Sequence, residues 1–233
     1  MKDIGRSSLT IQSLIGKSDV GDILDVVLND RLQGQHLGLN ECIRLIKSND
    51  ICSIGLTGNI LRQKLYGNTA TFVNNIILNY TNVCITNCKF CAFYRPPGHI
   101  ESYTLSVEEI VRRVILAKNM FGITQVLIQG GHNPTLKIEY YEDAFKKIKV
   151  KCPEVGIHGL SASEIDMIAK VEESSTKEIL ARLKAAGLDS LPGAGAEILD
   201  DDVKAEISPL KIDSQEWLSI MEEAHELGIR SSA

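Results

Sequence analysis

Apolar residues recur at helical spacing in the first third of the chain. Positions 20–28 and 39–47 predict two helices, and a less regular helical segment runs through Leu61 and Leu65. No strand-like run interrupts these segments. We therefore expect residues 1–66 to form a helical cap that precedes the main domain.

The pattern changes at Gly67 to an alternation of strand-like and helix-like segments. A β-branched, apolar run predicts a buried strand at 71–83. Later strand-like runs occupy 123–129, 155–160 and 188–192, with one more beginning at Ile229, and helical patterns occupy 106–121, 138–150, 176–186 and 214–227. Ser106 precedes Glu109 by three residues, which predicts a capping box at the start of the first of these helices.

Strands and helices in strict alternation predict right-handed crossovers and a parallel sheet. The expected fold class is therefore α/β, with residues 67–233 forming a (β/α) barrel of the TIM type, complete or partial. The chain stops at Ala233, just as a fifth strand begins, and an open sheet edge would expose unpaired backbone. We expect the barrel to be truncated at its C-terminus, and this fragment to be prone to aggregation and catalytically inactive.

Composition narrows the class of protein. The chain has 233 residues, of which 44% are hydrophobic and 24% are charged, so it can bury a sizeable core. It has no run of about 20 apolar residues and no secretory signal pattern at its amino terminus, so we expect a cytoplasmic protein that does not bind membranes. A net charge of −5 disfavours nucleic acid as a partner, but it does not exclude a small-molecule substrate that is anionic.

The most informative chemistry lies directly after the first strand. Cys84, Cys88 and Cys91 have C-x3-C-x2-C spacing, which offers three thiolates to one centre from a single short loop. The alternatives are a structural zinc site or unrelated buried cysteines. Structural zinc requires a closed set of four ligands, and the sequence has no second Cys or His pair to complete it. The remaining cysteines, Cys42, Cys52 and Cys152, are scattered singly.

Several polar or glycine-rich segments follow the other strands. In a (β/α) barrel the reactive groups lie on loops after the carboxyl ends of strands. The candidates there are Gln129, Gly130, Gly131, Ser161 and Glu197, together with His158 on its strand and Tyr94, His99 and His132 beside the loops. Their ordinary interpretations are a tight turn, a solvated helix-start glutamate and a satisfied core histidine. Tyr94 ranks highest of the last three because it follows the cysteine loop and neighbours Arg95.

These segments resemble the radical S-adenosylmethionine (radical SAM) enzymes. The resemblance rests on the cysteine triplet with Phe90 before its last member, and on QGGHNP, IHGLSASEI and GAGAEIL. It implies a radical SAM barrel whose three cysteines hold a 4Fe-4S cluster with one open iron, which would chelate S-adenosylmethionine. An electron carrier would normally have four thiolates.

The resemblance also implies roles for the candidates. Phe90 would pack against the adenine, and the segment Gln129–Gly131 would bind the methionine end of the cofactor, with Gln129 where many members have a charged residue. Ser161 would contribute to the same pocket, and Glu197 would accept hydrogen bonds from the ribose hydroxyls or the ammonium group. Tyr94, His158 and Glu197 are the residues expected to act in catalysis.

Within the superfamily the sequence is most similar to the branch that joins aromatic rings to nucleosides or ribityl compounds. It resembles the dehypoxanthine futalosine cyclases of a menaquinone pathway most, and the tyrosine-transferring subunits of deazaflavin (FO) synthases and the aminofutalosine synthases next. The implied reaction is reductive cleavage of S-adenosylmethionine, with a reductant such as flavodoxin or ferredoxin as partner, followed by hydrogen removal from the substrate and ring closure. The alternatives are tyrosine hydroxybenzyl transfer to a ribityl-aminouracil, and an inactive or electron-transfer iron-sulfur module.

Overall fold

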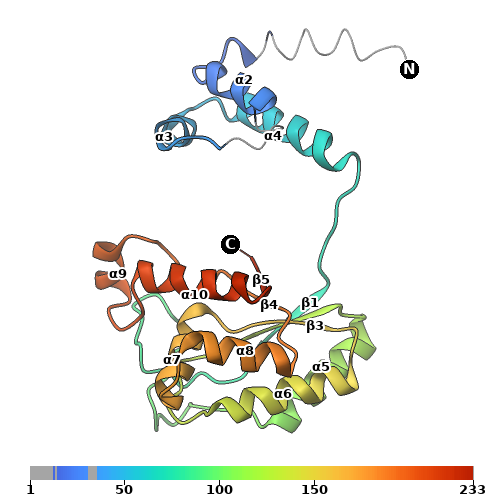
Figure 1. Cartoon of the computed structure of the whole chain (residues 1–233), viewed down its shortest axis with the longest axis vertical. Helices are drawn as coiled ribbons and strands as arrows, with labels where there is room; N and C mark the ends of the chain where they lie inside the picture. The colour runs from blue at the N-terminus through green and yellow to red at the C-terminus, as the bar shows by residue number, and fades with distance from the viewer. Residues whose placement is uncertain (1–12, 14, 31–35, 233) are drawn as a thin grey trace. The chain divides into compact units, whose positions relative to one another are not determined.

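The computed structural model describes residues 13, 15–30 and 36–232, and the chain divides into two compact units at Phe72 and Val73. The first unit contains helices α2 (Gly21–Asp30), α3 (Leu39–Lys47) and α4 (Ile51–Tyr66), so the helices expected in this region are confirmed (Figure 1). The helices enclose a small core formed by Ile15, Val20, Ile23, Leu24 and Leu28.

The second unit is built on a parallel sheet of five strands in sequential order, as in the first part of a (β/α) barrel. The strands are β1 (Asn75–Asn79), β2 (Gln125–Gln129), β3 (Gly156–Gly159), β4 (Ser190–Leu191) and β5 (Arg230–Ser231). The helices are α5 (Val107–Phe121), α6 (Ile138–Lys151), α7 (Ala162–Glu172), α8 (Thr176–Ala186), α9 (Asp201–Ile207) and α10 (Ser214–Glu226). The α/β fold class expected from the sequence is confirmed.

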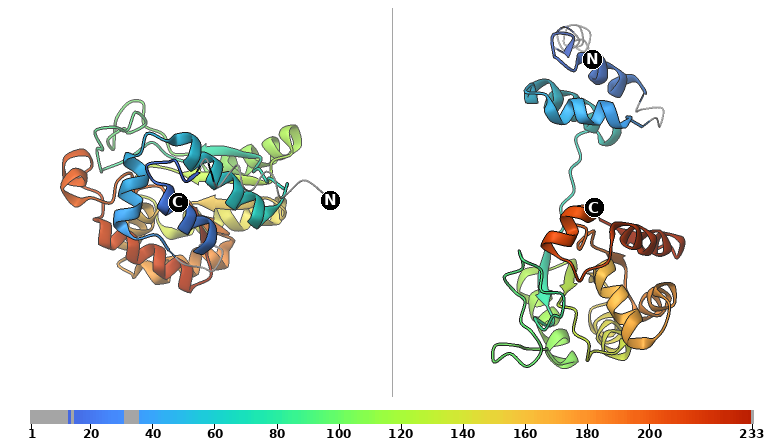
Figure 2. Two further views of the ribbon diagram at one scale, coloured as in Figure 1. Left: turned by 90° about the horizontal axis from the view of Figure 1, so that it is seen from above. Right: turned by 90° about the vertical axis from the view of Figure 1, so that its left-hand side faces the viewer.

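One face of the sheet is buried and the other is partly open. Val126, Ile128 and Ile157 are fully buried in the core that the helices cover, whereas Gln125 and Gln129 on the alternate positions are only half-buried. Helix α6 packs between α5 and α8 on the covered side, an arrangement seen from three directions in Figures 1 and 2. The half-open face and the strand ends therefore carry the polar groups.

Helix α5 has a capping residue at each end. Ser106 accepts a hydrogen bond from the Glu109 N–H at the start of α5, and Gly122 ends this helix with φ +61°, in the left-handed region that favours glycine. The expected capping box is wrong there, because the Glu109 carboxylate binds Arg112 and Arg113.

Two other expectations need correction. The first strand covers only Asn75–Asn79, because the chain beyond it bridges instead to the segment 95–104. Helices α7 and α9 were not predicted. They place two helices in each of the last two crossovers, so the alternation is not strict. None of the described helices is both long and apolar enough to cross a membrane.

Candidate functional site

A pocket of about 220 Å³ opens at the carboxyl ends of the strands. The cysteine loop, the segment after β2, the start of α7 and the loop after β4 all contribute to it. Its lining residues are Asn79, Thr81, Asn82, Cys84, Thr86, Cys88, Phe90, Cys91, Phe93, Tyr94, Tyr103, Gln129, Gly130, Gly131, His132, Ser161, Glu164, Ala194, Gly195, Glu197 and Lys211. The parallel topology therefore brings four separate segments to one rim.

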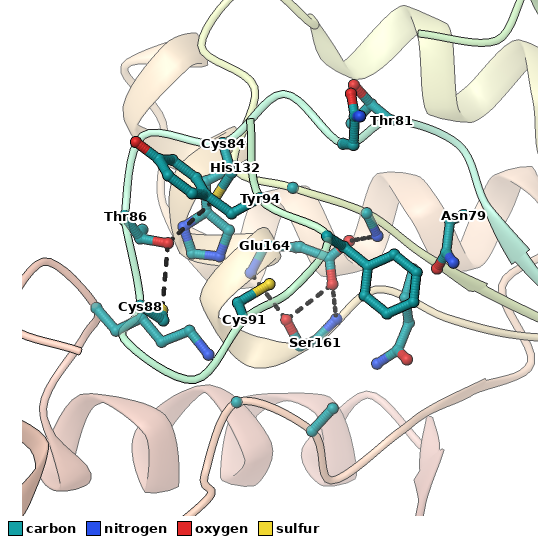
Figure 3. A pocket seen from close by; sticks show the side chains of 18 of the residues that line it. Asn79, Thr81, Cys84, Thr86, Cys88, Cys91, Tyr94, His132, Ser161 and Glu164 are labelled. Carbon is teal, nitrogen blue, oxygen red and sulfur yellow. Dashed lines mark hydrogen bonds between the residues drawn. The ribbon is translucent and has the colours of Figure 1, made fainter. Parts of the chain in front are cut away.

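The three thiols of the cysteine loop all line this pocket, and Figure 3 shows them beside the start of α7 (Figure 3). Cys84 and Cys88 are buried and Cys91 is exposed. The buried Thr86 hydroxyl lies 3.0 Å from the Cys84 Sγ and 3.5 Å from the Cys88 Sγ, so one side chain bridges the first two thiols. Across the residues that the structure describes, no group of three His, Cys, Asp or Glu side chains is close enough to hold a single metal ion.

Three distant segments hold the cysteine loop by backbone hydrogen bonds. The Cys84 N–H donates to the Arg95 carbonyl at 3.0 Å, and the Ile85 N–H donates to the His132 carbonyl at 3.2 Å. The Lys89 N–H donates to the carbonyl of Ile207, at the end of α9, at 2.9 Å. Because these partners are spread over more than a hundred positions, the loop conformation depends on the folded barrel.

The two glycines after β2 are required by close packing. A Cβ atom on Gly131 would lie 2.2 Å from the Val83 carbonyl oxygen and 2.8 Å from the Cys84 Cβ. A Cβ atom on Gly130 would lie 2.6 Å from the Tyr80 ring. A side chain at position 130 would therefore meet the ring of Tyr80 first.

Glu164 is a pocket residue that sequence reasoning missed. Its carboxylate is buried, which raises its pKa, while hydrogen bonds from Ser161, Tyr80 and the Gly130 N–H lower that pKa in part. Ser161 and Glu164 form a capping box at the start of α7. The sequence pattern Ser-x-x-Glu directly after a strand was the signal that could have identified it.

Of the described residues that line the pocket, Lys211 is the only Lys or Arg. Its side chain is 12% exposed, and its Nζ lies 2.7 Å from the Glu197 carboxylate and 5.5 Å from the centre of the Phe90 ring. Glu197 itself has φ +38°, an uncommon backbone conformation for a residue other than glycine. No local pattern distinguished Lys211 in the sequence, because its partners lie 14 and 121 positions away.

The expected histidine candidates fall in different places. His132 lines the pocket, and burial, with Lys211 and Lys170 nearby, lowers its pKa to about 4, so its ring is neutral at physiological pH. His158 is not among the residues that line this pocket. Its ring binds the Ser190 hydroxyl at 2.7 Å and the Ser232 hydroxyl at 3.3 Å, and burial lowers its pKa.

The remaining candidates are distributed between the pocket and the surface. Phe90, Tyr94, Gln129, Ser161 and Glu197 all line the pocket, whereas His99 is exposed and accepts a hydrogen bond from the Glu101 N–H. The structure thus brings most of the sequence-predicted set together and leaves His99 and His158 outside it.

Comparison with known proteins gives consistent matches. The family model of the radical SAM superfamily matches residues 78–233. The chain is 37% identical over 211 residues to cyclic dehypoxanthine futalosine synthase of Halalkalibacterium halodurans, covering 90% of this chain and 57% of that protein. It is 41% identical over 168 residues to 5-amino-6-(D-ribitylamino)uracil–L-tyrosine 4-hydroxyphenyl transferase of Methanopyrus kandleri, covering 72% of this chain and 45% of that protein.

A solved structure supports the fold. The crystal structure of HydG, a maturase of the FeFe-hydrogenase, superposes with a TM-score of 0.66 at 19% identity and covers 97% of this chain and 48% of that one. The chain spans about half the length of the curated relatives that it matches.

Proposed function

Because the chain belongs to the radical SAM superfamily, whose members use a 4Fe-4S cluster and S-adenosylmethionine, we propose that Cys84, Cys88 and Cys91 hold this cluster at the strand ends. The observation that carries the proposal is the single pocket that joins all three thiols to the segments after β2, β3 and β4. Thiolates are the ligands that iron-sulfur clusters take in proteins.

The donor set fits such a cluster. Among the described residues, three cysteines line the pocket, so a four-iron cluster bound by them would keep one iron without a protein thiolate. In a bound cluster each thiolate would bind its own iron, so the three thiols would not need the close spacing of the ligands of a single ion. The Gly131 backbone packs against the first cysteine at a distance that no Cβ would allow, which creates a close cradle beside the loop.

The surrounding residues would bind and orient the cofactor. When bound, the cluster supplies the electron that cleaves S-adenosylmethionine and starts radical chemistry. The half-exposed ring of Phe90 offers an apolar surface for the adenine, and Gln129 offers amide groups to the methionine end. The ion pair of Glu197 with Lys211 would hold the loop after β4 near Phe90, beside the expected position of the adenine.

We infer that the whole protein cyclises dehypoxanthine futalosine. The similarity to a cyclic dehypoxanthine futalosine synthase over 90% of this chain supports this substrate. The second candidate is transfer of the tyrosine hydroxybenzyl group to a ribityl-aminouracil. The 41% identity to the Methanopyrus kandleri transferase supports it, although this similarity covers a shorter part of the chain.

The cluster is tested by changing cysteines one at a time in anaerobically reconstituted protein. Cys88→Ala should abolish the cluster signal in electron paramagnetic resonance and lower the iron content. Cys152→Ala is the matched control, because Cys152 is buried at the end of α6, and it should leave both unchanged. Iron that survives loss of Cys88 and is lost with Cys152 would contradict the assignment.

The substrate is tested by incubating the whole protein, in its reduced form, and S-adenosylmethionine with each candidate and analysing products by mass spectrometry. Consumption of dehypoxanthine futalosine with formation of a product of cyclised mass supports the cyclase. Consumption of tyrosine with the ribityl-aminouracil would replace it with the transferase. A cluster that never cleaves S-adenosylmethionine would favour the electron-transfer alternative.

A further inference from the structure

One buried carboxylate joins the ends of three successive strands. The Glu164 side chain is 3% exposed, and its Oε1 accepts hydrogen bonds from the Tyr80 hydroxyl and the Gly130 N–H, both at 2.9 Å. Its Oε2 accepts from the Ser161 N–H at 2.7 Å and the Ser161 hydroxyl at 2.8 Å. Tyr80 follows β1, Gly130 follows β2 and Ser161 follows β3, so all four donors come from the strand ends. Figure 3 shows Ser161 beside Glu164.

The Glu164 carboxylate replaces a β3 carbonyl as hydrogen-bond acceptor at the point where β2 and β3 separate. The last ladder bond between β2 and β3 runs from the Leu160 N–H to the Ile128 carbonyl at 2.9 Å. Leu160 has φ +61°, and the chain leaves the strand direction there. The next donor of the β2 side, the Gly130 N–H, therefore meets the Glu164 carboxylate instead of a β3 carbonyl.

The backbone groups of Gln129 and Gly131, on either side of Gly130, form hydrogen bonds with the chain after β1. The Gln129 carbonyl accepts from the Tyr80 N–H at 3.3 Å, and the Gly131 N–H donates to the Thr81 carbonyl at 3.0 Å. Successive residues of a strand direct their backbone groups to opposite neighbours, so the Gly130 carbonyl faces the opened side. It has no hydrogen-bond donor among the described residues, and Gly130 lines the pocket.

We propose that Glu164 is a positioning residue that holds the ends of β2 and β3 apart and so keeps the Gly130 carbonyl oxygen available to an ammonium group, that of the amino-acid part of S-adenosylmethionine. A carbonyl that is held in place loses little freedom on binding, which favours the ligand. This role of Glu164 rests on the proposed function. The hydrogen bonds of its carboxylate go to Tyr80, Gly130 and Ser161 and not to the thiols of the cysteine loop.

The test compares Glu164→Gln with Asp166→Asn in cluster-loaded protein. The amide of Gln has one acceptor oxygen and would present its NH2 group to one of the two backbone N–H donors, so both strand ends cannot be held. We expect at least a tenfold rise in the Kd of S-adenosylmethionine, measured from the change that the cofactor causes in the electron paramagnetic resonance of the reduced cluster, at unchanged iron content. Asp166→Asn should change neither, because Asp166 lies on the same helix, pairs with Lys170 and does not line the pocket.

Hydrogen exchange supplies a readout that needs no cofactor. The Gly130 amide should exchange slowly in the wild type and faster in Glu164→Gln. Glu164→Asp keeps the charge but shortens the reach by one methylene, and serves if the Gln variant does not fold. It should also raise the Kd with iron retained.

The outcomes separate the two proposals. A wild-type protein that builds no cluster or binds no S-adenosylmethionine contradicts the proposed function. A wild type that binds it, together with an unchanged Kd in the Glu164 variants, overturns the positioning role alone. Loss of iron in both Glu164→Gln and Glu164→Asp overturns the positioning role as well, because Glu164 would then support the cysteine loop.

Discussion

Removing the Tyr80 hydroxyl should reveal whether Glu164 is charged in the folded protein. The ring is buried, and its hydroxyl donates to the Glu164 Oε1 at 2.9 Å. A hydrogen bond to a charged group contributes about 1.5–3 kcal/mol, against about 0.5–1.5 kcal/mol for a neutral pair. Tyr80→Phe should therefore lower the free energy of unfolding by about 1.5–3 kcal/mol near pH 8. Tyr140→Phe is the matched control, because its hydroxyl donates to the neutral carbonyl of Leu105 at 2.8 Å, and it should cost about 0.5–1.5 kcal/mol.

The cost should depend on pH with a definite sign. Burial raises the pKa of Glu164 above its ordinary value of 4.5, and the hydrogen bond from Tyr80 is one of the contacts that lower it again. A raised folded pKa means that the native state binds the proton more tightly than the unfolded state, so the contribution of this group to stability falls as pH rises through that pKa. Tyr80→Phe raises the pKa further. Its cost should therefore grow as pH rises through the folded pKa and shrink as the carboxyl becomes protonated.

Urea unfolding followed by tryptophan fluorescence measures this cost in the compact unit that contains Tyr80. The chain has one tryptophan, and Trp217 lies on α10 in the same unit as Tyr80. With a slope of about 1–3 kcal/mol per molar urea, the midpoint should fall by about 1 M for Tyr80→Phe. A cost equal to that of Tyr140→Phe at pH 8, or a cost independent of pH from 4 to 8, would refute the reasoning.

Two further predictions concern the cluster loop. Gly131→Ala should reduce the iron bound per chain, because its Cβ would lie 2.2 Å from the Val83 carbonyl oxygen, whereas Gly58→Ala has no atom within 4 Å and should leave the iron content unchanged. Lys211→Gln removes a positive charge that lines the pocket and pairs with Glu197, so the reduction potential of the cluster should fall in a redox titration, and an unchanged potential would show that this charge does not act on the cluster.

Much of the fold followed from local patterns. The helices at 39–47 and 176–186 and the strand at 123–129 were visible because apolar periodicity and caps depend on contacts within a few residues. Helix α7 was missed although it begins with the same Ser-x-x-Glu pattern as the predicted capping box. At the start of α5, by contrast, the Glu109 side chain does not close a capping box but pairs with Arg112 and Arg113 in the next turn.

The candidate site divides in the same way. The sequence by itself determined the three thiols and their spacing, because one short loop carries them all, and it determined that polar groups follow successive parallel strands. Only the tertiary structure decided that Glu164 meets Tyr80 and Gly130, which lie 84 and 34 positions away, and that Lys211 stands over Phe90. Such contacts depend on strand register and on where each strand ends, and these are set by packing of the whole sheet, which local periodicity does not encode.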